Sequence, residues 1–133
     1  MIKIICVGKI KEKYLNDLIS DYKTRISKYH KIEIIELKDT GIDNESNEIL
    51  SHLNDKDYNI CMDINGKEYT SVELSNLINN TFINGYGTIT FIIGGSDGIR
   101  DSVKNKCNMK LSFSHLTFPH GLFRGILLEQ IYR

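Results

Sequence analysis

Apolar residues recur along the chain with two different periods, and each period predicts one kind of element. Short apolar runs, most of them rich in β-branched residues, predict buried strands. These runs cover residues 1–8, 31–37, 58–64, 88–93 and 109–113. Other segments repeat apolar residues every three or four positions, which predicts helices. These segments are residues 12–30, a stretch that starts at Thr70 and ends at Asn84-Gly85, residues 121–132, and a shorter one over 99–107.

Strands that alternate with helices predict an α/β fold with a mostly parallel sheet and flanking helices. The length of 133 residues suits one core, so we expect a single domain over 1–133. Residues 39–46 are polar and include a glycine, which predicts a loop, and residues 48–53 predict a helical turn at most. The pair Asn65-Gly66 predicts a turn that ends the third strand.

Two of the predicted helices carry further signals. Thr70 and Glu73 have the spacing of a capping box, so a helix should start there. In the last helix, apolar residues cover most sides. They are Leu122, Phe123, Ile126, Leu127 and Ile131, with Gly125 and Leu128 on the other faces. A helix of this kind is usually buried on two sides, against a core and against an interface.

Composition excludes several classes of protein. The sequence has no apolar run long enough to span a membrane and no charged-then-apolar leader, so we expect a cytoplasmic protein without a membrane partner. Cys6, Cys61 and Cys107 stand singly, without the spacing of a zinc site. We expect them to be buried, reduced thiols that pack as small apolar side chains, and we expect no metal.

Charge is unevenly distributed although the net charge is zero. Residues 1–31 hold eight Lys and Arg against three acids, and residues 85–133 hold six against three. The middle of the chain, residues 32–84, holds eleven acids against three bases. Basic ends that meet in the fold would suit a polyanion such as RNA. The alternative is that the basic run only forms a solvated helix face.

Three predicted strand ends carry residues suited to a ligand, and ligands of parallel sheets bind at the carboxyl ends of strands. Met62-Asp63 follows the third strand and a glycine-rich segment, residues 94–98, follows the fourth. The glycine pattern is GGxxG without a following Lys-Ser/Thr, which argues against a phosphate-binding P-loop and weakens a dinucleotide site. Residues 112–118 alternate hydroxyl and apolar side chains, an arrangement that suits a purine-like ring beside an apolar floor.

Two charged or titratable residues on the last helix are candidates for chemistry. His120 follows the only proline, Pro119, and is either a hydrogen-bonding residue at the helix start or a base. Arg124 lies on a mostly apolar helix, where an isolated charge is unfavourable unless it is paired or functional. Arg124 and Glu129 are five residues apart and do not share a helix face. Arg124 is therefore expected to meet a phosphate or a carboxylate of another chain.

Several segments together carry a resemblance to a known family. They are I-I-C-V-G-K-I-K-E-K-Y at 4–14, D-I-N-G-K at 63–67, F-I-I-G-G-S-D-G at 91–98, L-S-F-S-H-L-T-F-P-H at 111–120 and L-L-E-Q-I-Y-R at 127–133. The chain resembles the ribosomal RNA large subunit methyltransferase H family. These SPOUT-superfamily enzymes methylate N3 of a pseudouridine in 23S ribosomal RNA. The resemblance runs in order over nearly the whole chain.

The resemblance implies a SPOUT-type C-terminal trefoil knot, a homodimer, and S-adenosylmethionine as cofactor. It also implies a substrate that is 23S rRNA in the assembled ribosome, with a composite active site at the dimer interface. Carried over position by position, the cofactor contacts fall on Met62, Gly94, Phe113, Ser114, His115, Leu116, Thr117 and Phe118. Transfer of a methyl group to N3 requires loss of a proton. We expect His120 to be the base, and Arg124 to orient RNA or stabilise the anion.

The sequence departs from the family pattern in two places. The segment between the second and third strands is shorter, so we expect a trimmed helix there. Family members also continue beyond Tyr132-Arg133 into a short tail with a Tyr-His-basic pattern. A catalytically silent dimer that binds rRNA or S-adenosylmethionine is therefore an alternative. A small nucleotide-binding α/β protein is a third reading.

Overall fold

The computed structural model describes residues 1–95 and 97–133, with His120 described by its backbone alone. Within these residues five strands form one sheet in the order β2-β1-β4-β3-β5. Every neighbouring pair is parallel. The strands are β1 (Ile2–Val7), β2 (Ile32–Leu37), β3 (Tyr58–Glu68), β4 (Ile89–Ile92) and β5 (Met109–Ser112). The predicted α/β fold with a parallel sheet is confirmed.

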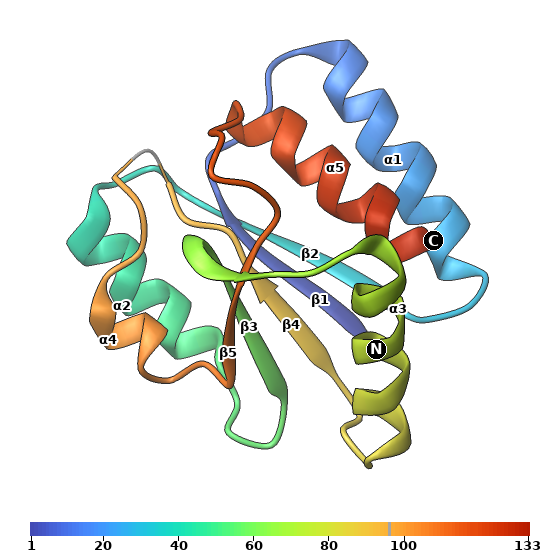
Figure 1. The fold of residues 1–133 in the computed structure, drawn as a ribbon. Coiled ribbons are helices and arrows are strands. Elements are labelled where there is room, and N and C mark those ends of the chain that lie inside the picture. Colours follow the sequence, from blue (N-terminus) through green and yellow to red (C-terminus); the bar gives the residue numbers. More distant parts are fainter. Residues whose placement is uncertain (96) are drawn as a thin grey trace.

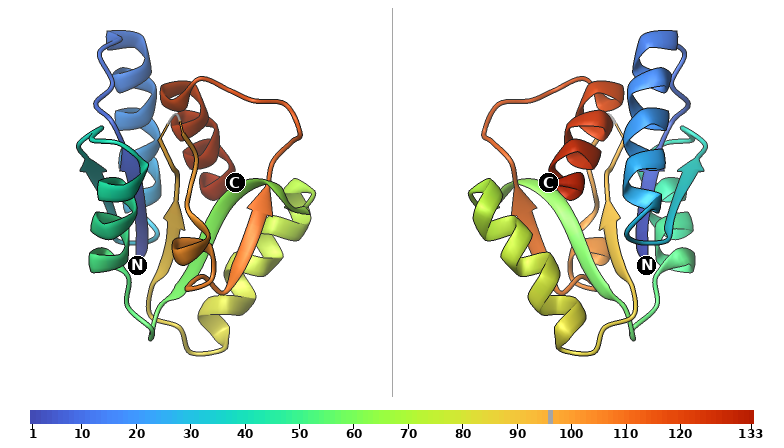
Figure 2. Two further views of the ribbon diagram at one scale, coloured as in Figure 1. Left: turned by 90° about the vertical axis from the view of Figure 1, so that its left-hand side faces the viewer. Right: turned by 90° about the vertical axis from the view of Figure 1, so that its right-hand side faces the viewer.

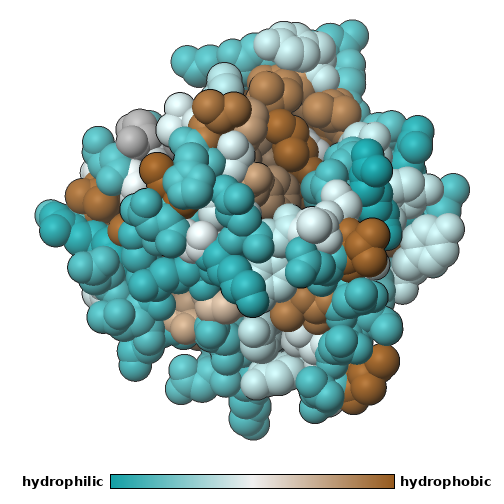
Figure 3. Space-filling model, in the orientation of Figure 1, coloured by the Kyte–Doolittle hydropathy of each residue, from teal (hydrophilic) through white to brown (hydrophobic). Residues whose placement is uncertain are grey.

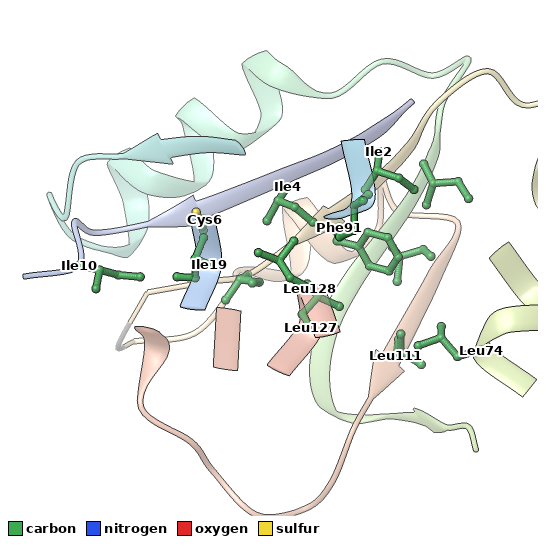
Figure 4. Close-up of a cluster of buried hydrophobic side chains, with 14 of the residues drawn as sticks. Ile2, Ile4, Cys6, Ile10, Ile19, Leu74, Phe91, Leu111, Leu127 and Leu128 are labelled. Carbon is green, nitrogen blue, oxygen red and sulfur yellow. The ribbon is translucent and has the colours of Figure 1, made fainter. Parts of the chain in front are cut away.

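Helices cover both faces of the sheet (Figures 1 and 2). On one face lie α1 (Lys13–Ser27), α3 (Ser71–Ile83) and α5 (His120–Tyr132), and on the other lie α2 (Ile42–His52) and α4 (Asp101–Lys104). The larger core is under the first group. Ile2, Ile4 and Phe91 of the sheet meet Leu127 and Leu128 of α5 there (Figure 4). Each central strand therefore buries side chains on both faces, as its apolar run predicted.

Helix α2 corrects one prediction. Residues 39–46 were expected to form a loop, and 48–53 a turn at most, but a helix of 11 residues runs from Ile42 to His52. Its buried side includes two polar residues, Glu45 and Ser46, beside Ile49. The Glu45 carboxylate accepts a hydrogen bond from the Gly41 N–H at 2.9 Å, which satisfies a free donor at the helix start. Because polar residues face inward, the helix lacks the apolar period that would reveal it.

Strand β3 corrects a second prediction. It does not end at Asn65-Gly66 but continues to Glu68, with a register shift against β5 between Met62 and Lys67. A Cβ atom on Gly66 would lie 2.7 Å from the carbonyl carbon of Lys110, so a larger residue would push the two strands apart. Gly66 therefore allows the backbones of β3 and β5 to approach closely, and it does not form a hairpin turn.

The remaining helix predictions hold with shifted ends. The capping box is confirmed, since the Thr70 side chain accepts from the Glu73 N–H and Glu73 accepts from the Thr70 N–H. Helix α4 is shorter than predicted and covers Asp101–Lys104. Helix α5 packs closely on α1, because Cβ atoms on Gly121 and Gly125 would lie 2.8 and 2.6 Å from leucines of α1.

Candidate functional site

A cavity of about 470 Å³ lies at the carboxyl ends of β4 and β5, beside residues 62–64 in the middle of β3. Its walls come from segments that are far apart in the sequence. They are residues 62–64, 93–95, 97–99, Lys104, 111–114, 116–118 and Phe123. In Figure 3 apolar side chains gather in the upper centre of the molecule and are bordered by hydrophilic ones. The sheet edge predicted to bind a ligand therefore carries a cavity of the size that small ligands occupy.

The cavity brings together most of the predicted cofactor residues. Seven of the eight line it: Met62, Gly94, Phe113, Ser114, Leu116, Thr117 and Phe118. His115 is not among the lining residues. Its imidazole Nδ1 lies 3.0 Å from the carboxylate of Glu68, and its side chain is largely exposed. Contact between His115 and a cofactor stays a prediction.

The glycine-rich loop after β4 is folded tightly on itself. The Gly98 N–H donates to the Gly95 carbonyl at 3.0 Å, and Gly98 has a φ of +84°, which favours glycine. A Cβ atom on Gly94 would lie 2.8 Å from the Gly98 carbonyl oxygen, and one on Gly95 would lie 2.7 Å from Glu45 Oε1. The glycines are thus required by the turn itself, and Glu45 of α2 supports the loop from behind.

The loop that follows β5 forms the aromatic wall. The Ser112 hydroxyl donates to the Ser114 carbonyl at 3.1 Å, and the Leu116 N–H donates to the Ser114 hydroxyl at 3.0 Å. Phe123 of α5 packs against Phe113 and Phe118, with ring centroids 5.4 and 6.1 Å apart. The serine hydroxyls are therefore used to shape the loop, while the phenylalanines give the cavity an aromatic, apolar surface.

An ion pair lies in the cavity wall. Lys104 Nζ is 3.1 Å from the Asp63 carboxylate, and their side chains are 21% and 9% exposed. Burial raises the pKa of Asp63, but the hydrogen bond from the Asn65 N–H and the ion pair with Lys104 outweigh it and hold the pKa below its ordinary value. Asp63 is therefore an anion at neutral pH. Asp63 was singled out from the sequence as a strand end, although β3 continues past it to Glu68, whereas Lys104 was missed.

Comparison with known proteins decides the family. The whole chain, residues 1–133, matches the family model described as a predicted SPOUT methyltransferase. The chain belongs to the SPOUT methyltransferase family. The resemblance drawn from sequence segments is thereby confirmed.

Curated relatives of this SPOUT protein share nearly half of its residues. Proteins named ribosomal RNA large subunit methyltransferase H from Clostridium botulinum and Streptococcus uberis are 49% and 47% identical to it over 145 residues. The protein of that name from Fusobacterium nucleatum is 48% identical over 141 residues. Each alignment covers 99% of this chain and 91% of the relative.

A solved structure supports the SPOUT fold independently of close sequence similarity. The structure of a probable methylase family protein from Haemophilus influenzae matches with a TM-score of 0.57 at 10% identity. The match covers 98% of this chain and 64% of that protein. At this identity the likeness shows the fold alone.

Of the two residues predicted to be catalytic, the structure describes the side chain of Arg124 but not that of His120. The side chain of His120 lies outside the described part. Arg124 is 3% exposed and is not among the residues that line the cavity. Its guanidinium donates to Glu36 at 2.7 Å and to the Val7 and Gly8 carbonyls at 3.4 and 3.2 Å. The carboxylate that meets Arg124 thus comes from the same chain.

The cysteines are free thiols, as predicted, but only Cys6 and Cys61 are buried and Cys107 is half-buried. Burial raises the pKa of Cys6 to about 11. A hydrogen bond with Cys107 and burial raise the pKa of Cys61. Across residues 1–95 and 97–133, no helix is long and apolar enough to cross a membrane.

Proposed function

We propose that this SPOUT protein is an S-adenosylmethionine-dependent methyltransferase that methylates N3 of a pseudouridine in 23S rRNA of the assembled ribosome. The observation that carries the proposal is the cavity, which is lined by seven of the eight predicted cofactor residues. The name shared by relatives at 47–49% identity supports the RNA substrate. With a ribosomal substrate, we also propose that the protein is cytoplasmic.

The cavity residues fit S-adenosylmethionine. An adenine ring suits the wall of Phe113, Phe118 and Phe123, since aromatic faces stack on flat rings. The cavity of about 470 Å³ lies within the range of about 300–1,000 Å³ typical of small-ligand sites. The cofactor supplies an already activated methyl group, so the protein has to place the target base and accept a proton.

His120 remains our candidate for the base that takes the N3 proton. It begins α5 directly after the loop that forms the aromatic wall. In the sequence it therefore lies between two residues that line the cavity, Phe118 and Phe123. An imidazole has a pKa near neutral pH and suits this task. Replacement of His120 by Asn should lower the rate of methyl transfer and leave cofactor affinity unchanged. Loss of both would contradict a role confined to proton transfer.

For Arg124 the contacts favour positioning rather than contact with RNA. Its hydrogen bonds join α5 to the carboxyl end of β1 and to Glu36 of β2. We propose that Arg124 holds α5, and through it the loop before α5, in place against the sheet. The expected stabilisation of an anion by Arg124 would require the guanidinium to leave these partners.

The loop between β1 and α1 is our candidate for the RNA surface. Lys9 and Lys11 of this loop and Lys13 at the start of α1 are all exposed, and none forms a salt bridge within the described residues. Ile10 between them is 6% exposed and accepts a hydrogen bond from the Asn16 side chain at 2.9 Å, which fixes the loop. The loop contacts the start of α5, since Ile10 lies 3.4 Å from the Cβ position of Gly121. Three exposed lysines thus lie where the chain packs against the start of α5, and we propose that phosphates bind there.

A charge-reversal experiment tests this surface. Changing Lys9, Lys11 and Lys13 to Glu should weaken ribosome binding and leave cofactor binding unchanged. The matched control changes Lys23, Lys28 and Lys31, which are exposed at the opposite end of α1 and before β2. Each lost phosphate contact should reduce the salt slope of log K by about 0.7–0.9. Equal losses of ribosome binding in the two triple variants would contradict the proposal that Lys9, Lys11 and Lys13 bind RNA.

We also propose the homodimer and the knot on the basis of the family. Helix α5 keeps Leu122 and Tyr132 more than a third exposed, and Leu116 of the preceding loop is 71% exposed. These apolar side chains offer a surface for a second copy. Light scattering of the purified protein tests the dimer, and a monomer at micromolar concentration would contradict it.

Methyl transfer to ribosomes from a strain that lacks the modification tests the proposed activity. Labelled methyl from S-adenosylmethionine should appear in 23S rRNA and map to a pseudouridine. Binding without transfer would favour the silent dimer, and preference for a nucleotide would favour the nucleotide-binding reading. Calorimetry should show saturable cofactor binding that Gly94→Val abolishes. Gly87→Val is the matched control, because a Cβ there has no atom within 4 Å.

A further inference from the structure

The charged and the aromatic residues of the cavity come from different segments of the chain. Its charged side chains are Asp63 after Met62, Asp97 in the glycine-rich loop, and Lys104 of α4. Its phenylalanines all come from residues 113–123. A ligand with a flat ring at one end and charges at the other would match this division. The aromatic part is assigned above to adenine, which leaves the charged part without a function.

Asp63 and Lys104 form a partly buried pair, and each can accept or donate further hydrogen bonds. One Asp63 oxygen accepts from the Asn65 N–H at 3.1 Å and the other lies 3.1 Å from Lys104 Nζ. Each carboxylate oxygen can accept more than one hydrogen bond, and an ammonium has three donors. Within the described residues Lys104 Nζ has one partner, Asp63. Both groups line the cavity, so both can bind a further charge there.

We propose that the Asp63–Lys104 pair binds the amino-acid end of S-adenosylmethionine, with the ligand ammonium against Asp63 and the ligand carboxylate against Lys104. This inference rests on the proposed function and names the residues that select its cofactor. A zwitterion and an ion pair can lie head to tail, so that each charge meets an opposite one. Charges removed from water need such partners, since an unpaired buried charge is strongly destabilising.

The same pair disfavours nucleotides that share the adenosine group. A phosphate carries only negative charge and would approach Lys104 beside the Asp63 and Asp97 carboxylates. Like charges at this range repel, so the polar end of the cavity prefers a zwitterion to an anion. The pair therefore determines specificity, whereas the aromatic wall accepts any adenosine derivative.

Three ligands with the same adenosine group test the proposal by calorimetry. S-adenosylhomocysteine keeps the amino-acid end, methylthioadenosine lacks it, and AMP replaces it with a phosphate. We expect the wild-type protein to bind S-adenosylhomocysteine at least about tenfold more tightly than methylthioadenosine, as charged hydrogen bonds permit. Equal affinities would overturn the inference and leave the proposed function standing. Failure to bind any of the three would overturn the proposed function as well.

Variants then assign the effect to the pair. Lys104→Met should weaken binding of S-adenosylhomocysteine about tenfold and that of methylthioadenosine less than about threefold. Asp63→Asn should weaken S-adenosylhomocysteine and strengthen AMP, because it removes a negative charge. Lys106→Met is the matched control, an exposed lysine outside the cavity, and should change neither. Equal weakening of both adenosine ligands by Lys104→Met would mean that the pair only shapes the wall, which overturns the inference. Where a variant fails to fold, the affinity ratio of the wild-type protein still tests whether the cavity recognises the amino-acid end, and equal affinities overturn the inference.

Discussion

The two faces of the sheet are covered in different ways. Helices α1, α3 and α5 bury a continuous apolar cluster, in which Leu127 and Leu128 are fully buried. Helices α2 and α4 cover a smaller cluster and bury polar groups beside it, among them Glu45. The first face supplies the aromatic wall of the cavity through α5, and the second supplies Lys104 and the support of the glycine-rich loop. One face mainly holds the fold together, and the other mainly places polar groups.

Matched truncations in the two cores should give the largest effect. Leu128→Ala and Ile49→Ala each create a cavity, with an expected loss of about 2–5 kcal/mol in the free energy of unfolding. We expect Leu128→Ala near the upper end, because the larger cluster surrounds it, and Ile49→Ala near the lower end. Urea denaturation measures both. A larger loss of unfolding free energy for Ile49→Ala than for Leu128→Ala would contradict the proposed difference between the two faces of the sheet.

Removal of the Arg124 guanidinium should have the next largest effect. Arg124→Met leaves the Val7 and Gly8 carbonyls and Glu36 without a donor, with an expected loss of about 1–3 kcal/mol. The loss is moderated because Glu36 is 44% exposed and water can solvate it. Arg100→Met is the control, since the Arg100–Asp43 pair is exposed and should contribute about 0–1 kcal/mol. Thermal denaturation of both variants measures the difference.

Glu45 links the polar face to the cavity. Glu45→Ala removes the acceptor for the Gly41 N–H and should reduce stability by about 1 kcal/mol, as loss of a helix cap does. It also leaves a gap behind Gly95, so cofactor affinity should fall by more than stability explains. Glu48→Ala changes an exposed residue of the same helix and serves as the control. Unchanged cofactor affinity in Glu45→Ala would contradict a role of α2 in supporting the cavity.

The smallest effect concerns pH. The pKa of Asp63 is held below its ordinary value of 3.8, so the folded state favours the ionised form. Its contribution to stability is fully present above this ordinary value and is lost as the pH falls through the lower pKa of the folded state. The wild-type protein should therefore lose stability more steeply than Asp63→Asn as the pH falls below about 4. Parallel slopes in acid denaturation would contradict this contribution.

Where side chains follow a regular apolar period, the sequence was sufficient to predict the fold. The helices α1, α3 and α5 and the five strands follow such periods, and the strand ends pointed to the cavity. Helix α2 was missed because Glu45 and Ser46 face inward. Lys104 was missed because it lies on a helix of four residues. In so short a helix, the spacing of apolar residues does not show which way a side chain points. The partner of Arg124 lies 88 residues away in the sequence, and only the sheet order brings them together.

The loop between β5 and α5 is anchored at both ends. Leu111 fixes one end within the sheet, and the close packing of Gly121 and Gly125 against α1 fixes the other. A loop restrained in this way before a ligand arrives loses little conformational entropy on binding. The aromatic wall is therefore preorganised, and more of the gross interaction energy remains as affinity.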